Sequence, residues 1–376
     1  MKKIRLLYIV TRCMKSGPIK VINQIVDNLD KDQFELYLIS INEEDQNRSL
    51  LELMKKKFYY QYCHINKIDV IFGRYNRLRE EIKKIDPDVI HSTGVIPDYL
   101  VNRIFPQKQV VTLHANYKID YTMQYGKIIG VPLAFFHIQV AKKAKKVIAC
   151  SKSLSEIYKK TKNFEVDYIR NGINYDVLDI QSIQAYKRKF DIPCDVITFI
   201  YVASFNKRKN HTFLADSFVK LHEQGKNYQL LFVGDGPSYQ ECYNTFSQYP
   251  YIHFEGRVSN VDDYLRAADY YVSSSMQEGM PIAVLEAMNQ GLPCVLSDID
   301  QHREIYEINN VIGVLYRQND FESLDEAIEK IVKIDRKTVG NEINHIVYEQ
   351  FQAVKMSEKY AQIYIEIATK NKKEYI

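Results

Sequence analysis

The first half of the chain alternates short apolar segments with amphipathic helical segments, and this order constrains the fold more than any other feature. Six segments are interpreted as strands: Ile4–Val10, Phe34–Ile41, Asp88–Ser92, Gln109–His114, Lys146–Cys150 and Asp167–Arg170. Four segments between them carry apolar residues at helical spacing: Ile19–Leu29, Gly73–Ile85, Pro132–Ala144 and Ser153–Lys160. Such alternation predicts a parallel sheet covered by helices on both faces. Ligands of these sheets bind beyond the carboxyl ends of the strands, so we expect the functional residues in the loops that follow them.

Length and turn signals predict two domains. A chain of 376 residues has room for two domains of ordinary size. The pair Asn171-Gly172 is a strong turn signal after the first alternating half, and Tyr175–Pro193 is interpreted as a linker with a first helix. Further apolar segments follow at Val196–Ala203, Tyr228–Val233, Ala268–Ser275 and Asn310–Leu315. We therefore place an α/β N-terminal domain at residues 1–172 and an α/β C-terminal domain at residues 173–349.

Composition excludes several classes of protein. No run of 18 apolar residues exists, so no membrane-spanning helix is expected. The short apolar run after Met1 has no small-residue cleavage site behind it, and a strand explains it better than a signal peptide. The six cysteines are scattered without a C-x-x-C pair. We therefore expect reduced thiols in a cytoplasmic protein, with no disulfide framework and no metal site.

The charge of the chain is distributed unevenly. Residues 1–170 contain 30 Lys and Arg against 18 Asp and Glu, whereas the remainder contains 21 against 29. Between residues 101 and 150 Asp120 is the only acid, and Lys142-Lys143-Ala144-Lys145-Lys146 forms a basic cluster. No nucleic-acid motif accompanies these charges, so nucleic acid is not expected as a partner. Attraction to an anionic membrane leaflet is the preferred interpretation, and a solvated helix end is an equal alternative for the Lys cluster alone.

Two carboxylates separated by seven residues, Glu278 and Glu286, lie in the segment Met276–Met288. The segment follows the apolar stretch Ala268–Ser275, which is interpreted as a buried strand that runs into a polar loop. Pro281 suits the first position of a helix, where its missing N–H costs nothing. Glu278 is therefore expected in a strand-to-helix loop and Glu286 inside the helix, about 7–8 Å along the axis from Pro281.

This layout suits a ligand that carries a diphosphate between two polyols. Backbone N–H groups from Gly279 to Ala283 and the helix dipole attract phosphate, and Gly279 lets the backbone approach the ligand closely. A carboxylate on either side can accept hydrogen bonds from sugar hydroxyls. The alternative is that Glu278 solvates or caps a loop and Glu286 lies on a wet helix face, since the spacing alone is common.

The run Glu278-Gly279-Met280-Pro281 through Glu286-Ala287, followed by Gly291-Leu292-Pro293-Cys294-Val295, resembles the E-x7-E signature of retaining glycosyltransferase family 4. Further matches follow the order of the family over about residues 4–330. The resemblance implies the GT-B fold, with two Rossmann-like domains that face each other across a deep cleft. It also implies a C-terminal helix at about residues 350–370 that packs back on the N-terminal domain.

The resemblance assigns roles to the residues of the E-x7-E segment. Glu286 is expected on the ribose hydroxyls and Glu278 on the sugar hydroxyls as a catalytic residue. The backbone between them is expected on the donor diphosphate: Gly279, Met280, Pro281, Ile282 and Ala283. The family works without a bound metal, so neither a metal nor another cofactor is expected.

The loop Ser204–His211 follows the strand Val196–Ala203, and its cations suit a diphosphate. In the resembling family an Arg and a Lys hold this group. Lys209 matches the Lys, whereas Ser204 occupies the position of the Arg. Lys207 or Arg208 is expected to supply the missing charge, and the sequence leaves open which one does. A merely solvated basic loop is the alternative.

Two other stretches carry candidate donor-binding residues. Gly17, in the loop Lys15-Ser16-Gly17-Pro18 after the first strand, can bring backbone against a phosphate or form a plain turn. The family usually has two glycines there. Arg257 and Val258 match a family segment whose backbone contacts the nucleobase. Gly234-Asp235-Gly236-Pro237 lacks the third glycine of a dinucleotide fingerprint, which disfavours a nicotinamide enzyme.

His114 ends the segment Gln109–His114, where the family commonly carries a His. The resemblance implies that it contacts the donor sugar or positions the acceptor hydroxyl, and a packed polar residue is the alternative. The Tyr-rich segment Asn116–Tyr125 follows at once. It is expected to be a long loop, either an acceptor-binding lid or a plain connection.

The resemblance thus predicts a retaining glycosyltransferase that moves a sugar from a nucleotide-diphosphate sugar, most often a UDP-sugar, to a glycan or lipid-linked acceptor in cell-surface polysaccharide synthesis. The enzyme is expected in the cytoplasm, peripherally on the inner face of the plasma membrane. A catalytically silent GT-B subunit of a transferase complex, which binds nucleotide sugar or serves as a scaffold, is the alternative, because Ser204 and the altered glycines at 16 and 298–304 depart from the family pattern. A GT-B sugar-nucleotide epimerase is a further one.

Overall fold

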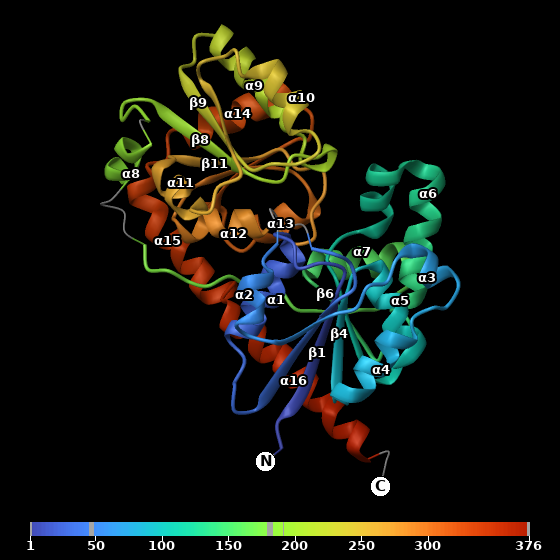
Figure 1. Cartoon of the computed structure of the whole chain (residues 1–376). Helices are drawn as coiled ribbons and strands as arrows, with labels where there is room; N and C mark the ends of the chain where they lie inside the picture. Colours follow the sequence, from blue (N-terminus) through green and yellow to red (C-terminus); the bar gives the residue numbers. More distant parts are fainter. Residues whose placement is uncertain (1, 45–48, 179–182, 191, 374–376) are drawn as a thin grey trace. The chain divides into compact units, whose positions relative to one another are not determined.

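The computed structural model describes residues 2–44, 49–178, 183–190 and 192–373 (Figure 1). The chain divides into two compact units. The N-terminal unit comprises Met1–Asn174 together with Ala353–Ile376, and the C-terminal unit comprises Tyr175–Gln352. Part of the predicted linker, residues 179–182 and 191, lies outside the described residues.

The N-terminal unit is built on a seven-stranded sheet in the order β3-β2-β1-β4-β5-β6-β7, with every neighbouring pair parallel. Its strands are β1 (Ile4–Val10), β2 (Phe34–Ser40), β3 (Tyr59–Tyr62), β4 (Val89–Thr93), β5 (Gln109–Leu113), β6 (Lys146–Ala149) and β7 (Asp167–Tyr168). The strand order reverses direction between β1 and β4. The central strand β1 is buried from Leu6 to Val10, as expected when helices cover both faces of a sheet.

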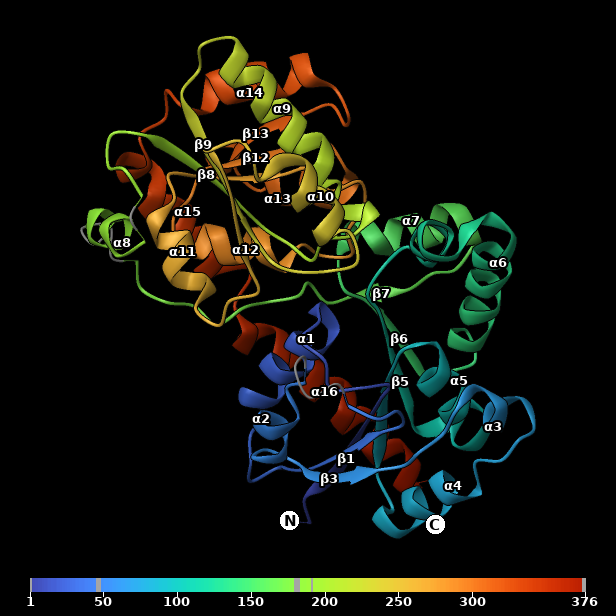
Figure 2. The ribbon, with the colours of Figure 1, turned by 45° about the horizontal axis from the view of Figure 1, so that its top comes forward.

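Helices connect these strands and cover the sheet (Figures 1 and 2). They are α1 (Gly17–Asp27), α2 (Leu51–Lys55), α3 (Lys67–Ile71), α4 (Asn76–Ile85), α5 (Val95–Ile104), α6 (Tyr117–Ala141), α7 (Lys152–Lys162) and, from the end of the chain, α16 (Ala353–Lys373). Ser357 of α16 donates a hydrogen bond to the carbonyl oxygen of Ile25 at the end of α1. The last helix therefore completes the fold of the first unit.

The C-terminal unit has a six-stranded parallel sheet in the order β10-β9-β8-β11-β12-β13. Its strands are β8 (Ile197–Val202), β9 (Tyr228–Val233), β10 (Ile252–Gly256), β11 (Tyr270–Ser273), β12 (Cys294–Ser297) and β13 (Gly313–Tyr316). Its helices are α8 (Ile183–Lys189), α9 (His211–Glu223), α10 (Tyr239–Phe246), α11 (Val261–Ala267), α12 (Ile282–Asn289), α13 (Asp300–Tyr306), α14 (Phe321–Ile331) and α15 (Arg336–Gln350). The predicted pair of parallel-sheet α/β domains is confirmed.

The Tyr-rich segment after β5 is a helix, so the prediction of a long loop was wrong. Helix α6 begins at Tyr117 and includes the whole segment, with a non-helical residue at Gly126 (φ 75°, ψ 169°). Tyr117, Tyr121 and Tyr125 are four residues apart, so they lie on one helical face. The rings of Tyr117 and Tyr121 stack with centroids 5.4 Å apart. The stacked tyrosines stabilise this helix, which the composition of the segment did not indicate.

Candidate active site

The order of strands in the C-terminal unit brings two loops together. Strands β8 and β11 are neighbours in the sheet, and the chain leaves them in opposite directions, towards β9 and towards β12. This is the switch point of a doubly wound sheet, where ligands bind outside the carboxyl ends of the strands. The loop after β8 contains Ser204 to Asn210, and the loop after β11 contains Ser274 to Pro281.

The loop after β8 is held in a fixed turn by its own side chains and by β11. Asn206 accepts a hydrogen bond from the backbone N–H of Lys209 and caps a single 3-10 turn, Lys207–Lys209. Asn210 follows in the left-handed conformation (φ 54°). The carbonyl oxygen of Lys209 accepts hydrogen bonds from the hydroxyls of Tyr201 and Ser274, both 2.9 Å long. These hydrogen bonds fix the backbone of the turn that carries the cationic side chains.

Glu278 is the centre at which the two loops meet. Its side chain is buried, and its Oε1 accepts a hydrogen bond from the Ser275 hydroxyl at 2.6 Å. The Lys209 ammonium forms an ion pair with the same oxygen, and the Arg208 guanidinium donates to Oε2 at 2.8 Å. Arg208 also donates to the carbonyl oxygen of Gln277 at 2.7 Å. One carboxylate therefore holds two cations from consecutive residues.

Electrostatics keep this carboxylate ionised despite its burial. Burial by itself opposes ionisation, but the charges of Lys209 and Arg208 and the hydrogen bonds from Lys209 and Ser275 outweigh it and lower the pKa of Glu278 far below its ordinary value of 4.5. Burial lowers the pKa of Lys209, and the nearby Glu278 opposes that shift. We conclude that the pair is ionic at neutral pH.

Arg208, rather than Lys207, is the second cation at this centre. Lys207 is exposed, whereas Arg208 is half-buried against Glu278. Ser204, at the position where the resembling family has an Arg, is exposed and donates a hydrogen bond to the carbonyl oxygen of Asp235 at 3.1 Å. The site thus has two cations, supplied by adjacent residues of the turn.

Helix α12 begins one residue later than the sequence indicated. Pro281 is the N-cap, and Ile282 is the first helical residue. The N–H groups of Ile282 and Ala283 have no partner within the helix because they lie in its first turn. Glu286 lies inside the helix and is half-buried, and Met280 and Gly279 are buried in the preceding loop. The expected arrangement of one carboxylate in the loop and one in the helix is confirmed.

The loop after β9 packs directly on the loop after β8. A Cβ atom on Gly234 (φ +147°) would lie 2.0 Å from the carbonyl oxygen of Ala203, so only glycine permits this approach. The carboxylate of Asp235 pairs with Arg257 at 3.3 Å, and both groups are partly exposed. Val258 is half-buried beside Arg257. These residues border the same edge of the sheet as the cationic turn.

Two buried polar residues near Glu278 escaped the sequence analysis. His302 of α13 is fully buried; its Nδ1–H donates to the carbonyl oxygen of Ser297 at 2.8 Å, and burial lowers its pKa to about 4. Its Nε2 has no hydrogen-bond partner among the described residues, and neither has Oε1 of Gln277. With Nδ1 protonated, the neutral ring presents Nε2 as an acceptor. For His302, the only signal in the sequence was a polar residue on a short helix after β12.

The two candidates in the N-terminal unit lie after strands of its sheet. Gly17 is exposed and is the first residue of α1, with open space around its Cα. His114 directly follows β5 and is half-buried. Burial lowers its pKa to about 4, so the ring is neutral at physiological pH. His114 thus lies in the loop after β5, whereas Gly17 begins a helix and does not lie in the predicted loop.

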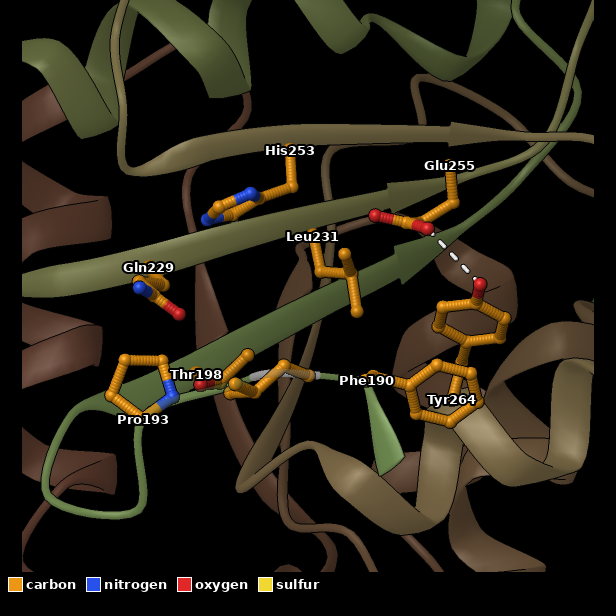
Figure 3. Close-up of a pocket in the computed structure, with 9 residues that line it drawn as sticks. Phe190, Pro193, Thr198, Gln229, Leu231, His253, Glu255 and Tyr264 are labelled. Atoms are coloured by element: carbon orange, nitrogen blue, oxygen red, sulfur yellow. Dashed lines mark hydrogen bonds between the residues drawn. The ribbon is translucent and has the colours of Figure 1, made fainter. Parts of the chain in front are cut away.

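A separate pocket of about 50 Å³ lies in the C-terminal unit (Figure 3). Its lining includes Thr198, Gln229 and His253, which are near the beginnings of β8, β9 and β10, and Glu255 accepts a hydrogen bond from Tyr264 at 3.0 Å. The pocket is thus far along the strands from the cationic turn and has room for only a few waters. Among the described residues no group of three or more His, Cys, Asp or Glu could hold a metal.

Two parallel-sheet α/β units are the architecture of the GT-B fold. A glycosyltransferase from Rickettsia africae superposes with a TM-score of 0.77 at 20% identity, over 98% of this chain and 99% of that one. Residues 17–177 match the family model described as Glycosyltransferase Family 4, and residues 182–345 match the one described as Glycosyl transferases group 1. The chain therefore belongs to these glycosyltransferases.

Relatives from Escherichia coli match over almost their whole length. The O-antigen biosynthesis glycosyltransferase WclY is 23% identical over 96% of this chain and 98% of its own. The UDP-Gal:alpha-D-GlcNAc-diphosphoundecaprenol alpha-1,3-galactosyltransferase is also 23% identical, over 97% of each chain.

Proposed function

We propose that this glycosyltransferase is a retaining enzyme that transfers a sugar from a UDP-sugar to a lipid-linked glycan acceptor in polysaccharide synthesis. The convergence of Lys209 and Arg208 on Glu278 at the switch point carries the proposal. Two adjacent cations beside a helix N-terminus suit a diphosphate and supply charge for a leaving UDP without a metal. The relatives named for O-antigen synthesis and for a diphosphoundecaprenol acceptor support the choice of acceptor.

In the proposed donor complex the diphosphate takes the place of the Glu278 carboxylate on the two cations. Lys209 and Arg208 then hold the phosphate oxygens, together with the first N–H groups of α12. Glu278, released from one or both cations, accepts hydrogen bonds from sugar hydroxyls. Glu286 holds the ribose hydroxyls, and Arg257 and Val258 border the base. His302 Nε2 is available to accept a hydrogen bond from the sugar.

The proposed reaction breaks the bond between the anomeric carbon and the β-phosphate oxygen and forms a bond from that carbon to the acceptor oxygen. The acceptor attacks from the side of the leaving group, and its proton passes to the β-phosphate oxygen. UDP leaves with the negative charge that the two cations stabilise. His114, neutral at physiological pH, orients the acceptor hydroxyl or the sugar. Because the acceptor attacks from the side of the leaving group, no covalent intermediate on Glu278 is required.

The scaffold alternative rested on Ser204 in place of the family Arg and on the altered glycines at 16 and 298–304. Arg208 supplies a second cation from the same turn, so the catalytic function is favoured. Location in the cytoplasm, peripherally on the inner face of the plasma membrane, is part of the proposal and is motivated by the acid-poor segment of residues 101–150. No described helix is long and apolar enough to cross a membrane.

A panel of nucleotide sugars incubated without acceptor tests the donor assignment. Slow hydrolysis of one UDP-sugar by the wild type, abolished by Glu286→Ala, is the expected result and would also identify the sugar. The matched control is Glu322→Ala, which removes an exposed carboxylate in the first turn of α14. Hydrolysis of only a non-uridine donor would overturn the choice of UDP. Failure of every donor and free nucleotide to bind would overturn the proposal in favour of a scaffold subunit that binds no nucleotide, and binding of a donor without turnover in the presence of acceptor would favour a silent nucleotide-sugar-binding subunit.

A further inference from the structure

Helix α6 folds back on itself at Gly126 and forms a helical hairpin in the N-terminal unit (Figure 1). The two arms touch closely, because a Cβ atom on Gly130 would lie 2.3 Å from the backbone oxygen of Tyr121. The Tyr121 hydroxyl bonds Nδ1 of His137 at 2.7 Å, and His137 Nε2 bonds the buried carboxylate of Asp98 on α5, also at 2.7 Å. Contacts between the two arms and with α5 therefore fix the hairpin to the helices that cover the sheet.

The second arm of the hairpin is apolar on both faces. The face towards the protein carries a regularly spaced buried set: Gly130, Ala134, His137, Ile138 and Ala141. The opposite face carries an exposed apolar set: Ile128, Ile129, Val131, Pro132, Phe135 and Phe136. Ile128 is 91% exposed and Phe135 is 59% exposed. A helix that is apolar all round is usually buried on all sides, so this outer face needs an apolar environment.

Charged residues in the same part of the sequence indicate which apolar environment suits the outer face of the hairpin. Residues 101–150 contain eight basic side chains, which are Arg103, Lys108, Lys118, Lys127, Lys142, Lys143, Lys145 and Lys146. Asp120 is the only acid in that range. Lys127 lies at the turn of the hairpin between the exposed Tyr125 and Ile128. An apolar face with an exposed Lys and an exposed Tyr at its tip matches the boundary between lipid headgroups and acyl chains.

We propose that the outer face of the α6 hairpin inserts into the headgroup region of an anionic lipid bilayer and seats the enzyme on it. Exposed Ile and Phe side chains enter the acyl boundary, while Lys127 and neighbouring lysines pair with lipid phosphates. A second copy of this chain is a less suitable partner for the outer face of the hairpin, because a symmetric interface would bring like charges together. The membrane location deepens the proposed function, but lipid binding can be measured without any sugar transfer.

A single-tryptophan reporter tests the contact directly, because the chain contains no tryptophan. The full-length Phe135→Trp variant is mixed with phosphatidylcholine vesicles and with vesicles that also contain phosphatidylglycerol. We expect a blue shift of the emission and vesicle co-flotation with the anionic vesicles only. The matched reporter Tyr59→Trp, at an exposed position on β3, is expected to co-float without a blue shift.

A second pair of variants distinguishes insertion of the hairpin from nonspecific adsorption of exposed apolar side chains. Ile128→Ser combined with Phe135→Ser is expected to reduce partition onto anionic vesicles about tenfold or more, since two large apolar side chains no longer insert. Tyr59→Ser combined with Val177→Ser removes exposed apolar side chains elsewhere and is expected to leave partition unchanged. Circular dichroism of each variant shows that it is folded.

Three results would overturn the proposal. The folded wild type fails to bind anionic vesicles, or both reporters shift equally, or the Phe135→Trp emission shifts with protein concentration and without lipid. The last result would make the hairpin a dimer contact. None of them bears on donor hydrolysis in solution, so the failure of this inference and that of the proposed function are distinguishable.

Discussion

Lys209 and Arg208 reach the same carboxylate from consecutive positions of one turn. Glu278 therefore contacts the same two cations to which we assign the diphosphate. The buried ion pair is not by itself evidence of stability, because desolvation offsets much of the Coulombic attraction. Under the proposed donor binding, the diphosphate competes with the Glu278 carboxylate for the two cations.

Removal of either cation should weaken the binding of UDP. Lys209→Ala and Arg208→Ala are each expected to cost about 1.5–3 kcal/mol, the range for a hydrogen bond to a charged group. Lys207→Ala is the matched control, because Lys207 carries the same charge in the same turn but is exposed. Isothermal titration calorimetry with UDP measures all three. Equal weakening by Lys207→Ala would show that only the net charge of the turn matters.

Glu278→Gln should abolish turnover without loss of affinity for free UDP. The amide cannot accept sugar hydroxyl bonds as strongly, and it no longer competes for the cations. A fall in turnover of about a hundredfold or more is expected, as for the loss of a preorganised electrostatic contact. Steady-state assay and calorimetry on the same preparation measure both quantities. Unchanged turnover would remove Glu278 from the site.

The same variant also has a pH signature in stability. Because the folded protein lowers the pKa of Glu278, the ionised form stabilises the fold above the ordinary value of 4.5. Near neutral pH the free energy of unfolding of Glu278→Gln should be about 3–5 kcal/mol lower than that of the wild type. As pH falls below 4.5 the difference should shrink, because the wild type loses this contribution. Urea denaturation at several pH values tests it; a difference that is independent of pH would contradict the assigned pKa.

The sequence predicted the position of the site better than its contacts. Glu278 was singled out by its spacing from Glu286 and by its place between a strand and a helix, and Lys209 by the resemblance of its loop to the family pattern. That Arg208 faces inward and Lys207 outward depends on the 3-10 turn capped by Asn206, whose geometry has no sequence period. His302 was missed because its significance lies in an unpaired buried nitrogen, which only packing reveals.

At the scale of elements, loop contacts near the site depend on the close approach of backbone segments. Gly234 lies against Ala203, and Gly236 approaches Phe205, where a Cβ atom would be 2.3 Å from the carbonyl oxygen. The loops after β8 and β9 are thus in direct backbone contact. A side chain at either glycine would separate them and move the turn that carries the cations.

Gly234→Ala should therefore destabilise the C-terminal unit by about 1–3 kcal/mol more than Gly225→Ala, through forced displacement of packed atoms. Gly225 also has a positive φ (+82°) but has open space around it, so it isolates the backbone strain from the clash. Thermal or urea unfolding of both variants gives the comparison. Equal destabilisation would mean that the loops separate without cost.

Strong apolar periodicity predicted most elements, and its absence explains the misses. Strand β1 was predicted to the residue, whereas the edge strand β3 (Tyr59–Tyr62) was missed because a short tyrosine-rich segment has no apolar alternation. In α6, Gly126 resembles a loop signal, and the tyrosine-rich arm before it has no strong apolar period. The hairpin forms because tertiary contacts of its aromatic residues override those local preferences.

At the scale of the whole molecule, the chain returns to its first unit at the end. The hydroxyl of Tyr364 on α16 bonds Nδ1 of His91 at 2.8 Å and the hydroxyl of Tyr8 at 2.9 Å. The hydroxyl of Tyr360 bonds Thr112 at 2.9 Å, and Thr112 bonds Nε2 of His91. Burial lowers the pKa of His91 to about 3, so this network is neutral. The first unit is consequently discontinuous in sequence, whereas the second is one continuous segment.

Deletion of residues 353–376 should therefore unfold the N-terminal unit selectively. It removes the tyrosines that satisfy His91 and Thr112, and each buried polar group left unpaired costs about 1–3 kcal/mol in addition to the exposed core. Hydrogen exchange should then show lost protection in β1, β4 and β5, with β8 to β13 still protected. Val354→Ser, at an exposed position of the same helix, is the control and should leave both units protected. Because the proposed diphosphate contacts all lie in the C-terminal unit, the truncated chain should still bind UDP; loss of that binding would mean that the first unit contributes to the nucleotide site.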